Sequence, residues 1–410
     1  MNVLYISTVF PKADENSTIY TDLAEALVER GHSVTVAAAD EKKKRTGTKL
    51  LQERGCTVLR VRTGNMYDVN IIEKGISILS LESIMSAAIR KHLKGKQFDL
   101  ILFEAPPVTL SGVVETAKNL FHAPAFLMMK DIFPQNAVDI DMMKKGSVVG
   151  RFFRMKEKKL YKVADNIGCM SEGNRSYIAE HNSVSLHKLS VFPNTKKIKP
   201  MPEKDIAIRD KYNIPKDKVV FVFGGNMGKP QGMNFLAKGI QRAEKVDEAF
   251  FVLVGRGTER ERVKEVLKDS RNVLILDNLP RYEYEALISS CDVGIVSLDY
   301  RFTIPNYPSR ILSYMEYGMP VLATTDRNTD FRDLIVESGC GYWCESKNLA
   351  DFVKNVKRFC QDANGRTRMG NASRKYIEEH FAVEKSVELL EGYWLDSIKD
   401  GDASEVFDNK

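Results

Sequence analysis

Short apolar runs rich in β-branched residues alternate with amphipathic stretches of helical spacing along most of the chain. Apolar runs of this kind are typical of parallel strands buried on both faces, and the stretches between them are typical of covering helices. The predicted strands are residues 3–7, 34–38, 58–62, 100–103, 126–129 and 167–171 in the first half, and 219–223, 251–254, 273–276, 293–297 and 321–323 in the second.

The alternation stops at residues 194–219, a segment rich in lysine and proline that we interpret as a linker. The pattern therefore predicts the α/β class, with two doubly wound, Rossmann-like domains facing each other across a cleft. We place the first domain at residues 1–194, the second at 195–376, and a C-terminal helix that packs back on the first domain, with a frayed acidic tail, at 377–410. Ligands of such sheets bind beyond the carboxyl ends of the strands, so the loops there are where chemistry is expected.

Composition narrows the class of protein and of ligand. The 410 residues exceed what one core usually holds, and a net charge of +6 favours an anionic ligand or a membrane surface over nucleic acid. The six cysteines form no Cys-x-x-Cys pair, which argues against disulfides and zinc. No apolar run of about eighteen residues and no cleavable leader are visible, so we expect a cytoplasmic protein.

Three strand–loop–helix segments of the second half each place glycine or proline beside a cation. They are "FGGNMGKPQG" with Gly225 and Lys229, "LVGRGTER" with Arg256, and "YPSRIL" with Ser309 and Arg310. Glycines let the backbone approach a ligand, and helix starts offer N–H groups, so one diphosphate would explain all three. Taken alone, each segment is also compatible with a βαβ crossover that binds no ligand and whose cation is solvated.

Two segments of the first half offer further candidates. Asn16 and Ser17 precede a helix that should end at Gly31, and they either cap it or present donors to a phosphate. Asp131 follows a predicted strand, with Asn136 near in sequence. A carboxylate there can orient or deprotonate a sugar hydroxyl, although capping of the next turn is the alternative.

Other motifs are weaker. The residues "DID" at 139–141 match the Asp-x-Asp that binds a divalent metal in one class of sugar transferases, but they do not end a predicted strand, so no metal is expected. The histidines show no zinc-type spacing, and no serine lies in a Gly-x-Ser-x-Gly elbow. The segment "RFFRMKEKKLYK" is either a solvated face over a buried stripe or a contact for anionic lipid headgroups.

The chain as a whole resembles the retaining glycosyltransferases of family four, which have the two-domain GT-B fold. The resemblance is greatest to bacterial members that build O-antigen or capsular polysaccharide on a lipid carrier. It rests on segments that occur in the family's order: "LAEALVERGHSVTV", "EAPPVTLSG", "MKDIFPQNA", "ADNIGCMSEGN", "VFPN", "FGGNMGKPQGMNFL", "LVGRGTERERV", "LISSCDVGIVSL" and "YPSRILSYMEYGMPVLA".

The resemblance implies a function and a division of labour. The second domain would bind a nucleotide diphosphate sugar, with UDP as the expected nucleotide, and the first would bind a polyprenyl-linked or saccharide acceptor, with the protein peripheral on the inner face of the plasma membrane. No metal or other cofactor would be needed, since cations and helix starts neutralise the leaving diphosphate.

Departures from the family's pattern affect individual positions. At the two positions where many relatives carry glutamate, this chain has Pro305 and Ser313, and Glu316 aligns with neither position. Where relatives carry an arginine and a lysine in the first glycine loop, this chain has Asn226 and Gln231. The predicted set is Asp131 as catalytic residue, Glu104 and Asn136 on the acceptor side, and Asn16, Ser17, Gly225, Asn226, Lys229, Gln231, Arg256, Ser309, Arg310 and Ser313 around the donor.

Two other functions stay open at this level. The missing glutamates are compatible with a non-catalytic nucleotide-sugar-binding accessory protein. A nucleotide-sugar 2-epimerase shares the architecture, but it needs a histidine in the cleft, and none follows a predicted strand.

Overall fold

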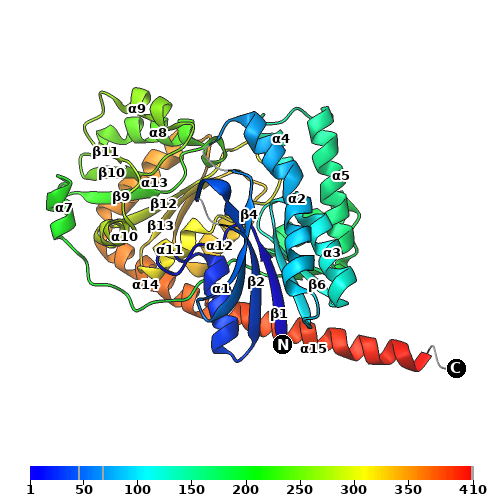
Figure 1. The fold of residues 1–410 in the computed structure, drawn as a ribbon. Coiled ribbons are helices and arrows are strands. Elements are labelled where there is room, and N and C mark those ends of the chain that lie inside the picture. Colours follow the sequence, from blue (N-terminus) through cyan, green and yellow to red (C-terminus); the bar gives the residue numbers. More distant parts are fainter. Residues whose placement is uncertain (45–46, 67–68, 408–410) are drawn as a thin grey trace. The chain divides into compact units, whose positions relative to one another are not determined.

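The computed structural model describes residues 1–44, 47–66 and 69–407, and the chain divides into two compact units. Unit 1 comprises Met1–Val138, Met143–Lys197 and Ala382–Lys410, and unit 2 comprises Asp139–Met142 and Ile198–Phe381. Figure 1 gives the order of the elements along the chain. The last residues of the tail that the sequence predicts to be frayed, 408–410, lie outside the described part of the chain.

Unit 1 is built on an eight-stranded sheet in the order β3-β4-β2-β1-β5-β6-β7-β8. All neighbouring strands are parallel except β3, which pairs antiparallel with β4 at the edge. The strands are β1 (Asn2–Ser7), β2 (Ser33–Glu41), β3 (Lys49–Glu53), β4 (Cys56–Thr63), β5 (Leu100–Ala105), β6 (Ala125–Met129), β7 (Asn166–Cys169) and β8 (Leu189–Val191).

Helices cover both faces of the unit 1 sheet. One face carries α1 and α15, whose Val383, Val387 and Leu390 join the core formed by β1, β2 and α1. Helices α2, α3 and α5 pack side by side, and Figure 1 shows them together on the other face. The helices are α1 (Ile19–Glu29), α2 (Ile71–Leu93), α3 (Ser111–Phe121), α4 (Gln135–Asp139), α5 (Val148–Val163), α6 (Glu172–Asn182) and α15 (Val383–Phe407).

Unit 2 is built on a six-stranded parallel sheet in the order β11-β10-β9-β12-β13-β14. The chain therefore winds outward from β9 in both directions, and ligands of such sheets bind at this switch point, beyond the carboxyl ends of the strands. The strands are β9 (Val219–Gly224), β10 (Ala249–Val254), β11 (Val273–Leu276), β12 (Val293–Ser297), β13 (Val321–Thr325) and β14 (Gly341–Glu345).

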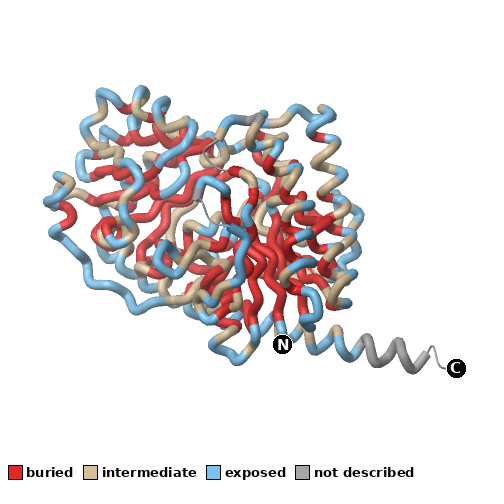
Figure 2. The backbone as a smooth tube through the Cα atoms, viewed as in Figure 1, coloured by how far each residue is buried: buried red, intermediate tan, exposed pale blue. Residues whose placement is uncertain are grey.

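The four central strands of unit 2, β9, β10, β12 and β13, are buried and appear red in Figure 2, whereas the edge strand β11 is only partly buried. Residues of α8, α9 and α13 share one core cluster with β9 and β10. The helices are α7 (Ala207–Lys211), α8 (Met233–Arg242), α9 (Arg260–Leu267), α10 (Arg281–Ser290), α11 (Arg310–Glu316), α12 (Phe331–Ser338), α13 (Leu349–Gln361) and α14 (Ala363–His380).

The predicted α/β class with two doubly wound sheets is confirmed. Sequence analysis missed β3, β8 and β14, which all lie at sheet edges and are short or interrupted by polar residues, so they lack a continuous apolar run. Among the described residues, none of the helices combines the length and the hydrophobicity that crossing a bilayer requires.

Candidate active site

Two glycine loops lie against each other at the carboxyl edge of the unit 2 sheet. Gly225, with φ +120°, donates its N–H to Val254 O at 2.9 Å, and Gly255, with φ +141°, follows the neighbouring strand. A Cβ on Gly255 would lie 2.0 Å from Gly225 O, so no larger residue fits without a shift of the backbone. Gly225 and Asn226 remain exposed, and the loops therefore present backbone to any ligand at this edge.

Arg310 fixes a positive charge beside the first glycine loop. Its Nη1 donates to Gln231 Oε1 at 2.8 Å, and its guanidinium carbon lies 4.1 Å from the centre of the Phe223 ring. Nη2 would be 3.0 Å from a Cβ on Gly225. Burial lowers the pKa of Arg310, and no carboxylate of the described residues forms an ion pair with it. This half-buried guanidinium would be stabilised by an anion.

Tyr314 fastens helix α11 to strand β9 and so positions Arg310. Its hydroxyl donates to Val222 O at 3.2 Å and accepts from Gly224 N at 3.2 Å. Gly294 on β12 allows the ring to pack there, since a Cβ at that position would lie 2.3 Å from the ring. The sequence motifs gave no sign of this contact.

Helix α11 itself contributes less than its sequence predicts. It has seven residues, and its N-cap Ser309 makes no side-chain capping hydrogen bond. The charge at this position therefore comes mainly from Arg310. Ser313 is half-buried on the same helix, and the carboxylate of buried Glu316 accepts a hydrogen bond from Lys199 N at 3.0 Å, which gives it a structural role.

The remaining predicted donor residues are more dispersed. Lys229 and Arg256 are exposed on the two glycine loops, and Arg256 lies 3.8 Å from Asp277. Asn16 and Ser17 belong to unit 1, where the N-cap of α1 is Thr18, with its side chain accepting from Thr21 N. Asn16 is exposed, and its carbonyl accepts from Arg54 Nη2 at 2.6 Å.

A buried acid and a lysine meet at the carboxyl edge of the unit 1 sheet. Glu104 Oε1 accepts from Ser7 Oγ at 2.9 Å and from Thr8 N at 2.8 Å. Burial raises the pKa of Glu104 and lowers that of Lys130, while the charge of each partner opposes the shift of the other. Glu104 thus ties the ends of β1 and β5 together beside Lys130.

Asp131 follows Lys130 at the same edge. Its Oδ2 accepts a hydrogen bond from Asn136 Nδ2, so the structure brings these two predicted residues together. Burial raises the pKa of Asp131 to about 6, because its effect is larger than the lowering effect of the hydrogen bonds from Asn136 and Ile132. A carboxyl that titrates near neutrality is suited to accept a proton from a hydroxyl.

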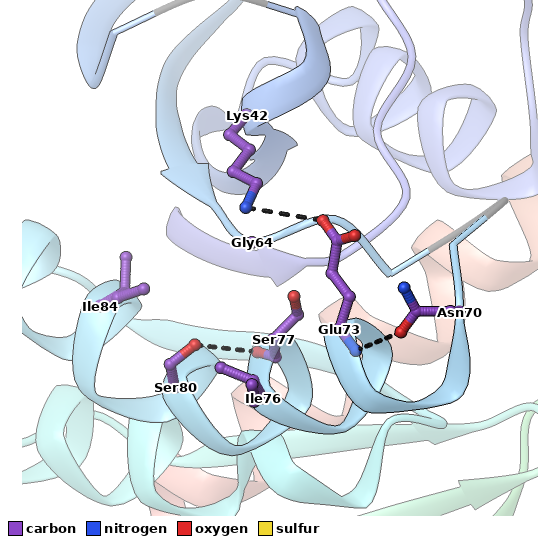
Figure 3. A pocket seen from close by; sticks show the side chains of 8 residues that line it. All are labelled: Lys42, Gly64, Asn70, Glu73, Ile76, Ser77, Ser80 and Ile84. Atoms are coloured by element: carbon purple, nitrogen blue, oxygen red, sulfur yellow. Dashed lines mark hydrogen bonds and ion pairs between the residues drawn. The ribbon is translucent and has the colours of Figure 1, made fainter.

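A cavity of about 870 Å³ lies in unit 1 beside the first turns of α2 (Figure 3). Asn70 caps α2 by accepting from Glu73 N at 2.9 Å, and Lys42 Nζ lies 3.5 Å from Glu73 Oε1. None of the predicted site residues lines this cavity, which no motif marked. Its lining residues are Lys42, Gly64, Asn70, Glu73, Ile76, Ser77, Ser80 and Ile84.

The "DID" carboxylates have partners inside unit 2. Asp139 accepts from Thr303 N at 2.7 Å and from Thr303 Oγ1, and Asp141 Oδ2 lies 2.7 Å from Arg301 Nη1. Within the described residues, no group of three or more metal-ligating side chains of histidine, cysteine, aspartate or glutamate occurs.

Two Rossmann-like units, one of them with glycine loops and an arginine without a described carboxylate partner at its switch point, define a two-domain α/β protein, and such switch points are where sheets of this kind bind ligands. Residues 17–195 match the family model "Glycosyl transferase 4-like domain", and residues 204–376 match "Glycosyl transferases group 1". The chain therefore belongs to the glycosyltransferases of the GT-B fold, and the resemblance seen in its sequence is confirmed.

Similar proteins agree with this family. The chain is 25% identical over 308 residues to "Probable glycosyltransferase WbjE" of Pseudomonas aeruginosa. The aligned residues cover 73% of this chain and 75% of that protein.

Solved structures share the fold at about 14% identity. Sucrose-phosphate synthase of Thermosynechococcus elongatus superposes with a TM-score of 0.76 over 98% of this chain and 100% of its own. HepE of Anabaena in complex with UDP gives 0.68 over 96% and 99%. WaaG, a glycosyltransferase involved in lipopolysaccharide biosynthesis, gives 0.62 over 94% and 99%.

Proposed function

We propose that this chain is a retaining glycosyltransferase that moves a sugar from a UDP-sugar to a saccharide or lipid-linked hydroxyl during synthesis of a bacterial surface polysaccharide. The observation that carries the proposal is Arg310, a half-buried guanidinium held against the glycine loop by Gln231 and Phe223, with no carboxylate partner in the described chain. The UDP complex of HepE and the lipopolysaccharide role of WaaG support the donor and the pathway class.

The donor would be bound by unit 2 without a metal ion. As the bond between the anomeric carbon and the diphosphate oxygen breaks, the nucleoside diphosphate leaves with the bonding electrons and gains negative charge. Arg310 is fixed in place before the reaction, so it stabilises this charge without reorganising. Lys229 and Arg256, exposed on the same loops, add further positive charge.

The acceptor would be activated by unit 1. Its hydroxyl oxygen forms the new bond to the anomeric carbon, and its proton passes to the Asp131 carboxylate, which Asn136 orients. With a pKa of about 6, Asp131 is mostly ionised at neutral pH and is still basic enough to take the proton. Retention requires that the new bond forms on the face that the diphosphate leaves.

The test is turnover with a panel of labelled nucleotide sugars and polyprenyl-diphosphate-linked or free saccharide acceptors, with and without EDTA. We expect release of UDP, a product with the donor's anomeric configuration by NMR, and no loss of rate with EDTA. Nucleotide binding without turnover on any acceptor would instead favour an accessory sugar-nucleotide binder, and interconversion of the donor sugar without transfer would favour an epimerase.

The lipid-linked acceptor motivates a membrane contact through helix α5. The structure divides its predicted cations into two sets: Arg154, Lys156 and Lys159 form ion pairs with Glu157, Glu82 and Glu115, whereas Arg151, Lys158 and Lys162 are exposed and form no ion pair with the described residues. Leu160 is buried, which places the apolar stripe of the helix inward.

The second set lies at helical spacing with two exposed apolar side chains, Val148 (76% exposed) and Met155 (57%). Such a face suits an anionic bilayer, to which each cation contributes about 1 kcal/mol. We expect salt-sensitive sedimentation with anionic but not neutral liposomes. It should be weakened by Lys158→Glu combined with Arg151→Glu, and less by the control Lys159→Glu. Wild-type protein that stays in the supernatant with anionic liposomes at low salt would contradict this contact.

A further inference from the structure

A second cavity, of about 490 Å³, lies in unit 2 among the loops that follow β9, β12 and β14. Cations outnumber acids in its lining, with Lys229, Lys238, Arg262, Arg301 and Lys347 against Glu259 and Asp299. Three of these cations form ion pairs, Arg262 with Glu259, Arg301 with Asp299, and Lys347 with Glu345 outside the pocket. The function proposed above uses only Lys229 of this set. We call these lining residues, together with Ser346, the cationic pocket.

The wall of the cationic pocket is held in place by specific contacts. Asp299 Oδ1 and Oδ2 accept from Arg301 Nε and Nη2 at 2.9 and 3.0 Å, so the charges of this acid and of Arg301 offset each other. Asp299 N donates to Pro230 O at 3.0 Å. A Cβ on Gly232 would lie 2.8 Å from Leu298 O, so glycine is needed for this close approach of the two loops.

Several hydrogen-bond donors of the pocket lack a partner. Lys229 and Lys238 are exposed and form no ion pair with the described residues. Ser346 is 1% exposed, and its hydroxyl has no hydrogen-bond partner in the described structure, although burial of an unpaired hydroxyl is costly. Helix α8 begins at the pocket with no acidic residue in its first turn and no side-chain cap. The N–H of Phe235 donates to Gly232 O at 2.9 Å, and the N–H groups of Met233 and Asn234 have no partner among the described residues.

We propose that the cationic pocket binds a phosphate group through Lys238, Ser346 and the start of α8, at a site separate from that of the donor diphosphate, to which Arg310 and Lys229 are assigned. The ammonium group of Lys238, the unpartnered hydroxyl of Ser346 and the start of α8 belong to residues that line one cavity, and a phosphate offers the several acceptor oxygens that such a mixed set of donors requires. The phosphate belongs either to a phosphorylated acceptor or to free inorganic phosphate, and the two sources share this chemistry.

The first experiment measures binding of inorganic phosphate to the full-length protein by calorimetry, alone and with saturating UDP. We expect Ser346→Ala and Lys238→Gln each to weaken phosphate binding about threefold to tenfold, whereas the control Lys357→Gln, an exposed lysine on α13 outside the pocket, leaves it unchanged. Ser346→Ala should also raise the melting temperature without phosphate, because it removes a buried unpaired hydroxyl.

Equal phosphate affinity in all three variants and the wild type, or loss of phosphate binding when UDP saturates the protein, would overturn the proposal. Arg310→Ala separates the phosphate site from the proposed function, since this variant should bind UDP about tenfold to a hundredfold more weakly and keep its phosphate affinity. A short-chain polyprenyl diphosphate then identifies the source: tighter binding than inorganic phosphate, again weakened by Ser346→Ala, assigns the pocket to the acceptor, and equal binding assigns it to free phosphate.

Discussion

At the carboxyl edge of the unit 2 sheet, the guanidinium of Arg310 lies against the first of two glycine loops, whereas the same edge of unit 1 carries Glu104, Lys130 and Asp131. The first arrangement holds a permanent charge that no described carboxylate compensates. The second holds groups whose protonation changes near neutral pH because burial shifts their pKa values. Under the proposed function, the same type of parallel sheet would thus bind an anion in one unit and accept a proton in the other.

The largest expected effect comes from removing the carboxylate of unit 1. Asp131→Asn should lower kcat about a hundredfold to ten-thousandfold, the range typical of a general base, and leave UDP affinity within about twofold. Its melting temperature at neutral pH should be equal or higher, because an ionised, buried carboxylate is removed. A variant that keeps wild-type kcat would assign Asp131 a structural role and break the comparison.

The matching change in unit 2 should act on binding. Arg310→Ala removes a charge-assisted contact worth about 1.5–3 kcal/mol, so the Kd for UDP should rise about tenfold to a hundredfold. Arg281→Ala, on helix α10 and outside the glycine loops, serves as the control. Calorimetry that finds unchanged UDP affinity in folded Arg310→Ala would place the diphosphate elsewhere.

These two residues also mark how far sequence analysis reaches. Arg310 and the glycine loops could be found because each lies within a local pattern of strand, glycine and cation. The hydrogen bond of Tyr314 to Val222 could not, since it joins residues 92 positions apart and depends on how α11 packs on β9. The same holds for the electrostatic interaction of Glu104 with Lys130, which arises because parallel strands bring their carboxyl ends together.

Loops far apart in sequence form the cationic pocket, so its residues share no motif. The family's pattern could not predict the roles of Asn226 and Gln231 either, because the cations that relatives carry at these positions are absent. The structure supplies a physical reason for Gln231, which holds Arg310 at 2.8 Å. Sequence alone gave the residue types at these positions but not their partners.

The pH dependence of activity sharpens the comparison because the carboxyl of Asp131 titrates near pH 6 whereas the guanidinium of Arg310 stays charged. If Asp131 must be ionised, kcat/KM should fall about tenfold from pH 7 to pH 5, given its pKa of about 6. UDP affinity should change much less, since Arg310 stays charged. A profile that falls equally in Asp131→Asn would assign the titration to another group, such as Asp326, whose pKa burial also raises to about 6.

The raised pKa of Asp131 affects stability in the opposite direction from activity, because the free energy of unfolding falls as the pH rises. The folded state binds the Asp131 proton more tightly than the unfolded chain does, so the contribution of this group is fully present below the unfolded pKa and is lost as pH rises through about 6. The free energy of unfolding of Asp131→Asn relative to wild type should therefore increase over this range. Denaturant titrations at a series of pH values measure it, and a constant difference would contradict the assigned pKa.

The smallest effect is expected from a change at Tyr314, which positions the helix that carries Arg310. Tyr314→Phe keeps the fully buried ring but removes the hydroxyl that bonds Val222 O and Gly224 N, at a cost of about 1–2 kcal/mol of unfolding free energy. UDP affinity should fall a few-fold, since α11 then carries Arg310 less rigidly. Tyr282→Phe, whose side chain is 74% exposed on α10, should change neither quantity. If Tyr314→Phe loses stability and keeps full UDP affinity, the packing of α11 alone is sufficient to hold Arg310 at the glycine loop.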